Sequence, residues 1–317
     1  MTKKAKQQEH AFVLSTVSFL FALNLTEAES NADRKEKKGR VTGKKRAAVQ
    51  SAFADIIGNR RSSEMSSVVK DILSKWTSDE KKLLFIDLAF ADPFFPYELK
   101  FDAKVFAKVF VSVAMLVGYD ESLATQILAT KNDALNAHKE TVIWKVLIAG
   151  SAVAVVCALG GWVAAPYFAT AIGGAAGLTG AAATSYGLAL LGGGSLAAGG
   201  MGMAGGLWIV TGVAAAMGTG LVTGGQLLYS MGADQARAEL IKLQVSFKEV
   251  LLHSQMQIGK AKEAITVLER DKTDIEKALD EERLLNESNG ARIEELKKKL
   301  KAIQISIQWM KKEEATG

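Results

Sequence analysis

Few side chains in this 317-residue sequence have the type and spacing that a chemical site requires. The chain has one cysteine, Cys157, and its three histidines are His10, His138 and His253. One cysteine can form neither an intramolecular disulfide nor a cysteine-based metal site, and the histidines are far apart in the sequence. We therefore expect no bound metal.

Two glycine-containing stretches resemble known site motifs, and neither has the spacing that its chemistry needs. A phosphate-binding loop has four residues between its glycines, whereas Gly39 and Gly43 in "GRVTGKKR" have three between them. The stretch "GLALLGGGSLAAGG" (187–200) follows no strand-forming run and contains no G-x-S-x-G. It therefore lacks the context of a dinucleotide site and of a nucleophile elbow. We expect a non-enzymatic protein without a cofactor.

The remaining signal is a set of glycine pairs whose spacing allows helix backbones to approach closely. They lie within residues 146–233, where 88 consecutive residues include no charged residue or histidine and hold 22 of the 29 glycines. In a helix exposed to water, each glycine costs about 1 kcal/mol relative to alanine. A bilayer instead forces the backbone to bond to itself and rewards small side chains. The pairs of this predicted glycine zipper are Gly173 with Gly177, Gly202 with Gly206, and Gly220 with Gly224.

Two stretches of this uncharged segment have the length and hydrophobicity of membrane-spanning helices. Residues 146–165 and 207–231 each supply the roughly 20 residues needed to cross an apolar core of about 30 Å. Between them, 168–206 is weakly hydrophobic, so two to four crossings fit the sequence. Lysines and arginines near the two ends are balanced, which favours an even number of crossings with both flanks on one side. The predicted interfacial anchors are Trp144, Lys145, Trp208 and Tyr229.

An alternative to permanent insertion is a glycine- and alanine-rich helical hairpin buried within a soluble bundle. The helices of both flanks would then cover the uncharged segment. Such a bundle could also be a soluble form that precedes insertion into a membrane.

Residues 1–145 are predicted to form a helical domain, which carries the formal net charge of +5. The run 34–46 holds eight Lys or Arg and one Glu, and we expect a solvated loop there, with contact to anionic lipid as the functional alternative. The run has no aromatic residue to stack on bases, so nucleic-acid binding is not expected. Residues 1–30 have the outline of a secretory signal, but polar residues in the apolar centre favour a first helix that packs on those that follow.

Local signals predict where the helices of this domain end. Pro93 and Pro96 lack the amide proton that a helix interior needs, so they separate two helical patterns. Gly118 is expected to end the second of these helices. Asp120 is expected to cap a helix that starts at Glu121 and could run on into the uncharged segment.

Residues 234–317 show a heptad pattern of apolar residues, typical of helices that pack along a seam. Asn289 and Gly290 form a turn signal within it, so the sequence allows either a hairpin of two helices or one continuous coiled coil. We favour the hairpin slightly. The seam is expected to mediate self-association or contact with a coiled-coil protein partner. Its predicted residues are Leu268, Ile275, Leu279, Ile293, Leu296, Leu300, Ile303 and Ile307.

The sequence thus predicts an all-α protein in three parts, 1–145, 146–233 and 234–317. Over residues 140–310 this architecture resembles helical membrane-inserting proteins, such as bacterial α-helical pore-forming toxins and the apolipoprotein L group. The resemblance implies a membrane protein that permeabilises the bilayer as an oligomer, as a toxin or a cell-death or defence effector does. The alternative is a membrane-anchored scaffold that recruits a partner through its coiled coil without forming a pore.

Overall fold

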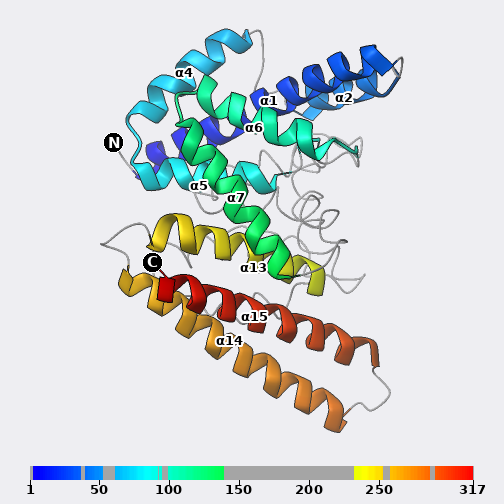
Figure 1. The fold of residues 1–317 in the computed structure, drawn as a ribbon, viewed down its shortest axis with the longest axis vertical. Coiled ribbons are helices and arrows are strands. Elements are labelled where there is room, and N and C mark those ends of the chain that lie inside the picture. The colour runs from blue at the N-terminus through cyan, green and yellow to red at the C-terminus, as the bar shows by residue number, and fades with distance from the viewer. Residues whose placement is uncertain are drawn as a thin grey trace. The chain divides into compact units, whose positions relative to one another are not determined.

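The computed structural model describes most of the two flanks and not the uncharged segment between them. The described ranges are 3–36, 40–52, 61–91, 93–94, 99–138, 232–252, 258–285 and 290–316. All regular secondary structure within these ranges is helical, which confirms the predicted all-α class for this part of the chain (Figure 1). Within the same ranges, no helix has both the length and the apolar character needed to cross a membrane.

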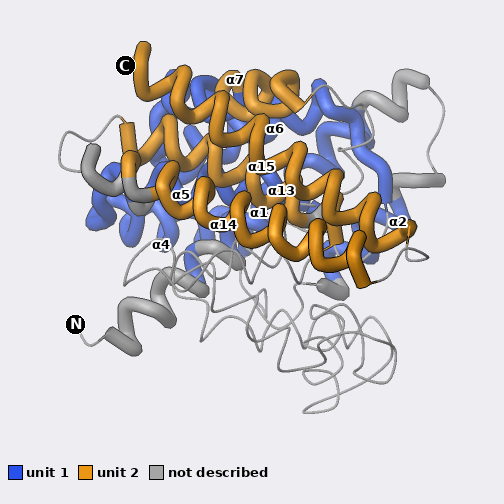
Figure 2. The backbone as a smooth tube through the Cα atoms, turned by 90° about the horizontal axis from the view of Figure 1, so that it is seen from below, with its two compact units in different colours: residues 1–128, 152–214 blue, residues 129–151, 215–317 orange. Residues whose placement is uncertain are grey.

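The chain divides into two compact units, which are coloured separately in Figure 2. Unit 1 comprises residues 1–128 and 152–214, and unit 2 comprises residues 129–151 and 215–317. The division falls within one helix, α7 (Glu121–Ala137). The sequence placed all residues up to 145 in one domain, whereas the second half of α7 groups with the C-terminal helices.

Unit 1 is built around its first helix. Its described helices are α1 (Lys3–Glu36), α2 (Arg40–Ala52), α4 (Ser62–Ser74), α5 (Ser78–Phe90) and α6 (Ala103–Leu116). Helix α1 packs against α2, α4 and α6. Its buried positions include Val17, Phe19, Leu20 and Phe21 and so occupy every side of the helix, as expected of a helix enclosed by others. The first stretch is therefore a helix that packs on the helices that follow it.

Phenylalanine rings fill the core of unit 1. Phe21 of α1 meets Phe106 edge-on, with 4.8 Å between ring centroids. Phe85 of α5 meets Phe110 of α6 edge-on at 6.0 Å and stacks on Tyr119 at 4.2 Å. Edge-to-face and offset contacts of this kind add about 0.5–1.5 kcal/mol each to the stabilisation from burial alone. The aromatic cluster thus joins α1, α5 and α6 in one core.

The predicted helix ends of this region are confirmed. Helix α5 ends at Phe90 and α6 begins at Ala103, so the two are separated around the prolines. Gly118 has a φ of +81°, a left-handed conformation that glycine adopts without steric cost, and it follows the end of α6. Its position is also crowded, because an added Cβ would lie 3.3 Å from the Lys70 side chain.

Aspartates cap the next two helices. Asp102 Oδ1 accepts hydrogen bonds from the backbone N–H groups of Lys104 (2.7 Å) and Val105 (3.0 Å) at the start of α6. Asp120 Oδ1 accepts from Ser122 N (2.8 Å) and Leu123 N (3.2 Å) at the start of α7. Hydrogen bonds from the backbone N–H groups of Val105 and Lys104 lower the pKa of Asp102. At Asp120 the largest cause of the lowered pKa is the hydrogen bond from the Ser122 side chain. Helix α7 ends at Ala137, and the stretch from residue 139 into the uncharged segment lies outside the described residues.

Unit 2 combines the second half of α7 with the C-terminal helices. These are α13 (Ala233–Ser246), the π-helix η2 (Phe247–Leu252), α14 (Ile258–Leu285) and α15 (Gly290–Thr316). Helices α14 and α15 lie side by side and run in opposite directions (Figure 1). An ion pair between Lys311 near the end of α15 and Glu269 in the first half of α14 has 2.6 Å between Nζ and Oε1. The structure therefore has two separate antiparallel helices here, as in the hairpin alternative.

The predicted seam lies inside this pair of helices. Ile293 and Leu300 are half-buried, and the other six predicted seam residues are buried within unit 2. Helix α15 is enclosed on two sides, because it packs against both α14 and α13. Most of the seam is thus covered by the chain itself, and only Ile293 and Leu300 keep part of their surface accessible. The six buried residues are Leu268, Ile275, Leu279, Leu296, Ile303 and Ile307.

Candidate functional site

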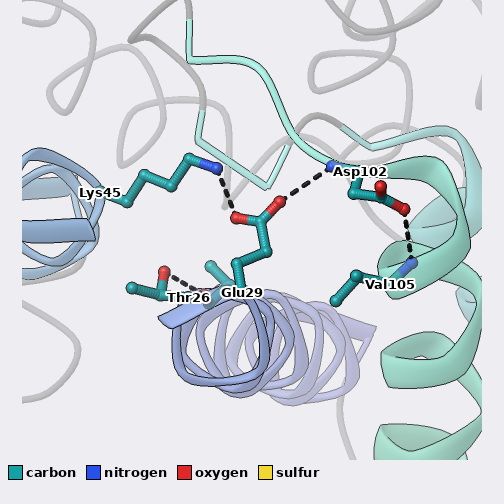
Figure 3. Close-up of polar contacts among 6 residues, drawn as sticks. Thr26, Glu29, Lys45, Asp102 and Val105 are labelled. Atoms are coloured by element: carbon teal, nitrogen blue, oxygen red, sulfur yellow. Dashed lines mark hydrogen bonds and ion pairs between the residues drawn. The ribbon is translucent and has the colours of Figure 1, made fainter. Parts of the chain in front are cut away.

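A buried polar cluster in unit 1, which we call the Glu29 junction, ties three segments together (Figure 3). It consists of Glu29 on α1, Lys45 on α2 and the backbone of Asp102 before α6. Glu29 Oε2 pairs with Lys45 Nζ, and Glu29 Oε1 accepts a hydrogen bond from Asp102 N at 2.9 Å. Lys45 Nζ also lies 5.1 Å from the centroid of the Phe94 ring. Both oxygens of this carboxylate are therefore engaged.

The Glu29 junction corrects the prediction for the basic run 34–46. We expected a solvated loop there, whereas α1 continues to Glu36 and α2 begins at Arg40. Lys45 is buried against Glu29 and is not available to a lipid headgroup, while Lys44 and Arg46 are exposed. The physical reason is that a helix alternates its faces, so a run of cations on a helix places some of them toward the core. A paired carboxylate offsets the free-energy cost of burying such a cation.

A second buried polar cluster, which we call the unit 2 junction, links α7 to α13, η2 and α15. Its residues are Thr130, His138, Gln244, Glu249 and Ser306, all of them buried. Thr130 Oγ1 donates to Glu249 Oε1 at 2.5 Å, and His138 Nε2 donates to Gln244 Oε1 at 2.9 Å. Ser306 Oγ lies 3.4 Å from both His138 Nε2 and Gln244 Oε1. One α15 hydroxyl thus completes the contact between the other two helices.

The order of these contacts fixes the relative direction of α7 and α13. Thr130 bonds to Glu249, whereas His138, eight residues later in the chain, bonds to the earlier residue Gln244. The two helices therefore run in opposite directions. His138 precedes residue 139, and Ala233 begins α13 eleven residues before Gln244. At 1.5 Å per residue, that separation is about 16 Å along the helix. His138 therefore lies beside the last turn of α13, about 16 Å along the helix from Ala233, and the two helices are antiparallel.

The π-helix η2 places the acidic member of the unit 2 junction. Phe247, Glu249 and Val250 are all buried within its six residues. A π-helical turn has a wider backbone than an α-helical turn and commonly occurs at functional positions. Here it directs the Glu249 carboxylate, 1% exposed, toward Thr130 of α7.

Burial changes the electrostatics of the neighbouring residue, Lys131. Its side chain is buried, and desolvation lowers its pKa to about 7. Burial therefore favours the neutral amine of Lys131 relative to an exposed lysine. Among the described residues, no cluster of His, Cys, Asp or Glu is arranged to hold a metal ion.

A further set of contacts reinforces the attachment of α7 and η2 to α15. Trp309 Nε1 donates a hydrogen bond to Asp133 Oδ2 at 2.9 Å. Lys248 Nζ pairs with Glu313 Oε2 at 2.7 Å and lies 5.9 Å from the centroid of the Trp309 ring. Helix α15 therefore holds the flanking helices of the uncharged segment at several points along its length.

The residues predicted from sequence and the residues in these junctions are different sets. The six glycines of the predicted zipper and the four interfacial anchors (144, 145, 208 and 229) lie outside the described residues. Of the junction residues, the sequence drew attention only to Lys45, within the basic run, and to His138, as an isolated histidine. The signal that could have found others is a polar residue on an apolar helix face. Ser306 is an example, because it stands between Ile303 and Met310 in the heptad pattern.

The described fold defines the class of this protein no further than all-helical. Comparisons with protein-family models, with curated proteins and with solved structures find no match for this chain. The resemblance to helical membrane-inserting proteins therefore remains one of architecture.

Proposed function

We propose that this protein inserts its uncharged segment, 146–233, into a lipid bilayer and permeabilises the bilayer as an oligomer. The observation that carries the proposal is the unit 2 junction, which fixes α7 and α13 in opposite directions at the two ends of an uncharged segment. Flanking helices that run in opposite directions suit an even number of membrane crossings. Both charged flanks then stay on one side.

The energetics support the same arrangement. A charged residue at the bilayer centre costs about 2.5–3.5 kcal/mol on insertion scales, and the uncharged segment contains none. All 73 charged residues lie in the flanks, which the junctions hold in folded units. The proposal thus assigns the membrane to one part of the chain and the folded helices to the aqueous side.

The self-association that a pore needs is assigned to the glycine pairs and not to the heptad seam. Most of the seam residues are covered by α14, α15 and α13 of the same chain. Glycines at four-residue spacing let helices approach closely in lipid, where close packing supplies the attraction between helices. Oligomer formation is therefore expected in the membrane, after insertion.

The test compares membrane binding with dye release in liposomes. We expect the wild-type protein to float with the vesicles and release an entrapped dye. The variant Gly202→Leu with Gly206→Leu should bind as well, because leucine is more lipophilic, but should release little dye, because bulk at the contact holds helices apart. The matched control is Gly43→Leu with Gly290→Leu, positions where an added Cβ meets no atom within 4 Å. This control should both bind and release dye.

Two results would contradict the proposal in different ways. Binding of the wild-type protein without dye release would favour the membrane-anchored scaffold over the pore. Failure to bind any vesicle would contradict insertion itself.

A further inference from the structure

Helix α15 has one side buried in unit 2 and an opposite side that carries five lysines. At 100° per residue, these lysines fall within an arc of about 140° on the exposed side of the helix. The other exposed residues between them include Gln304 and Gln308, which are uncharged. We call this surface the lysine face of α15, defined by Lys297, Lys298, Lys301, Lys311 and Lys312.

Three of these lysines have no carboxylate within ion-pair distance in the part of the chain that the structure describes. Lys297 pairs with Glu294 at 2.6 Å, and Lys311 pairs with Glu269 of α14 at 2.6 Å. Lys298, Lys301 and Lys312 are exposed and make no such pair among the described residues. Their charge is therefore open to an external partner.

The lysine face arises because basic and acidic residues that balance in number over the C-terminal region are distributed unequally between its helices. Residues 234–317 contain 16 basic and 16 acidic residues, so their sum is zero. Within this region, α14 has eight acidic and six basic residues, whereas α15 has seven basic and four acidic ones. Placing the two helices side by side thus separates the charges, and the exposed residues of α15 include only one acid, Glu294.

We propose that the lysine face of α15 binds the anionic headgroups of a lipid membrane. Lysine is a point charge on a flexible apolar stem, which suits mobile headgroups better than a fixed ligand. The lysines form a strip about 22 Å long, from Lys297 to Lys312, along the straight α15 helix, which suits a flat surface. Nucleic acid is less suited, because this face has no exposed aromatic ring to stack on bases and no arginine to bind phosphate with two hydrogen bonds.

The opposite side of α15 connects this surface to the uncharged segment. Ser306 contacts His138, which directly follows α7, and Trp309 bonds to Asp133 in the second half of α7. Packed helices have axes about 8–10 Å apart. Docking the lysine face therefore brings the end of α7, which precedes the segment, within about one further helix diameter of the headgroups. The inference rests on the proposed function for its choice of a membrane, but the binding that it describes requires no insertion.

The test is vesicle cosedimentation with two charge-matched triple variants. The first is Lys298→Gln, Lys301→Gln and Lys312→Gln. The control removes three exposed cations from α14 of the same unit: Lys262→Gln, Arg270→Gln and Lys277→Gln. Vesicles contain phosphatidylcholine with or without phosphatidylserine, and circular dichroism confirms that each variant is folded.

We expect the α15 variant to bind phosphatidylserine vesicles roughly 100-fold more weakly than wild type, from about fivefold for each lysine. The α14 control should change by less than about tenfold, and high salt should weaken wild-type binding because it screens exposed charges. Equal losses in both variants, or no loss in either, would overturn the inference. So would a loss confined to binding of a single-stranded RNA oligonucleotide.

Dye release at saturating protein separates this inference from the proposed function. Lysine-dependent binding without dye release supports the lysine face and contradicts the pore. If both triple variants bind vesicles as well as wild type does, the binding role of the lysine face is contradicted. If dye is also released in that case, the pore is supported.

Discussion

The first helix of unit 1 and the second half of α7 in unit 2 are attached to their units by different kinds of contact. In unit 1, phenylalanine rings from α1, α5 and α6 form a continuous aromatic cluster with one buried ion pair beside it. In unit 2, the contact of α7 with α13, η2 and α15 runs through buried hydrogen bonds. Apolar burial contributes about 25 cal/mol per Å², whereas an intramolecular hydrogen bond adds only about 1 kcal/mol net. We therefore expect α7 to separate from unit 2 more readily than α1 separates from unit 1.

Truncating the aromatic core should have the largest effect. Phe21→Ala removes a fully buried ring that contacts Phe106 and Phe110, and should lower the free energy of unfolding of unit 1 by about 4 kcal/mol. Hydrogen–deuterium exchange should accelerate in α1 and α6 and remain unchanged in α15. Equal acceleration in α15 would show that the two cores are not independent.

Breaking the Glu29 junction should cost nearly as much. Lys45→Met leaves the buried Glu29 carboxylate without its cation, which should lower the free energy of unfolding by about 3 kcal/mol in urea titration. Adding Glu29→Gln should recover part of this loss, because no charge then remains buried. If the double variant is less stable than Lys45→Met alone, the two residues do not act as a pair.

Raising the pH should stabilise unit 2. Burial lowers the pKa of Lys131 to about 7, while the unfolded chain keeps the ordinary lysine value near 10.4, so the unfolded state binds more protons between these values. Stability therefore increases with pH by about 1.4 kcal/mol per unit, or roughly 2–3 kcal/mol between about pH 7.5 and 9.5. Below about pH 7 both states bind the proton, and the dependence disappears. Lys131→Met should flatten the profile, as measured from urea midpoints.

A smaller loss is expected within the unit 2 junction. Thr130→Val keeps the shape of the side chain but removes the hydroxyl that donates to Glu249, and should destabilise the attachment of α7 by about 1–2 kcal/mol. Faster exchange of amides 129–138, with α1 unaffected, would be the signature. The exposed Thr125→Val on the same helix is the control and should change stability by less than about 0.5 kcal/mol.

The smallest expected change is a gain. Gly43 lies within α2, and an added Cβ meets no atom within 4 Å. Gly43→Ala should therefore stabilise unit 1 by about 0.5–1 kcal/mol, since alanine loses less backbone entropy in a helix. A loss of thermal stability would show that α2 is not helical at this position.

Local chemistry in the sequence was sufficient to predict many of the helix ends. A glycine such as Gly118 and a capping side chain such as Asp120 act on neighbouring residues, so their effect can be read from a few positions. The heptad pattern likewise predicted which faces of the C-terminal helices are apolar. It could not specify which helix covers those faces, because a partner chain and a neighbouring helix satisfy an apolar seam equally.

The polar junctions could not be predicted, because their partners are distant in the sequence. His138 and Gln244 are separated by 106 residues, and His138 and Ser306 by 168. No periodicity connects such residues, and hydrogen bonding alone does not specify a partner. Lys45 shows the related difficulty for charge: counting eight cations in a run reveals an attraction for anions, but not that one of these anions is Glu29 of the same chain.

The opposite directions of α7 and α13 also make the uncharged segment an insertion in the topological sense. The described residues on its two sides, His138 and Ala233, are separated by a distance of the order of 16 Å along α13. A linker of roughly six extended residues spans such a gap. Insertions with nearby ends can be gained, lost or exchanged without rethreading the host fold. The flanking helices are thus a frame into which segments of different length and composition could be fitted.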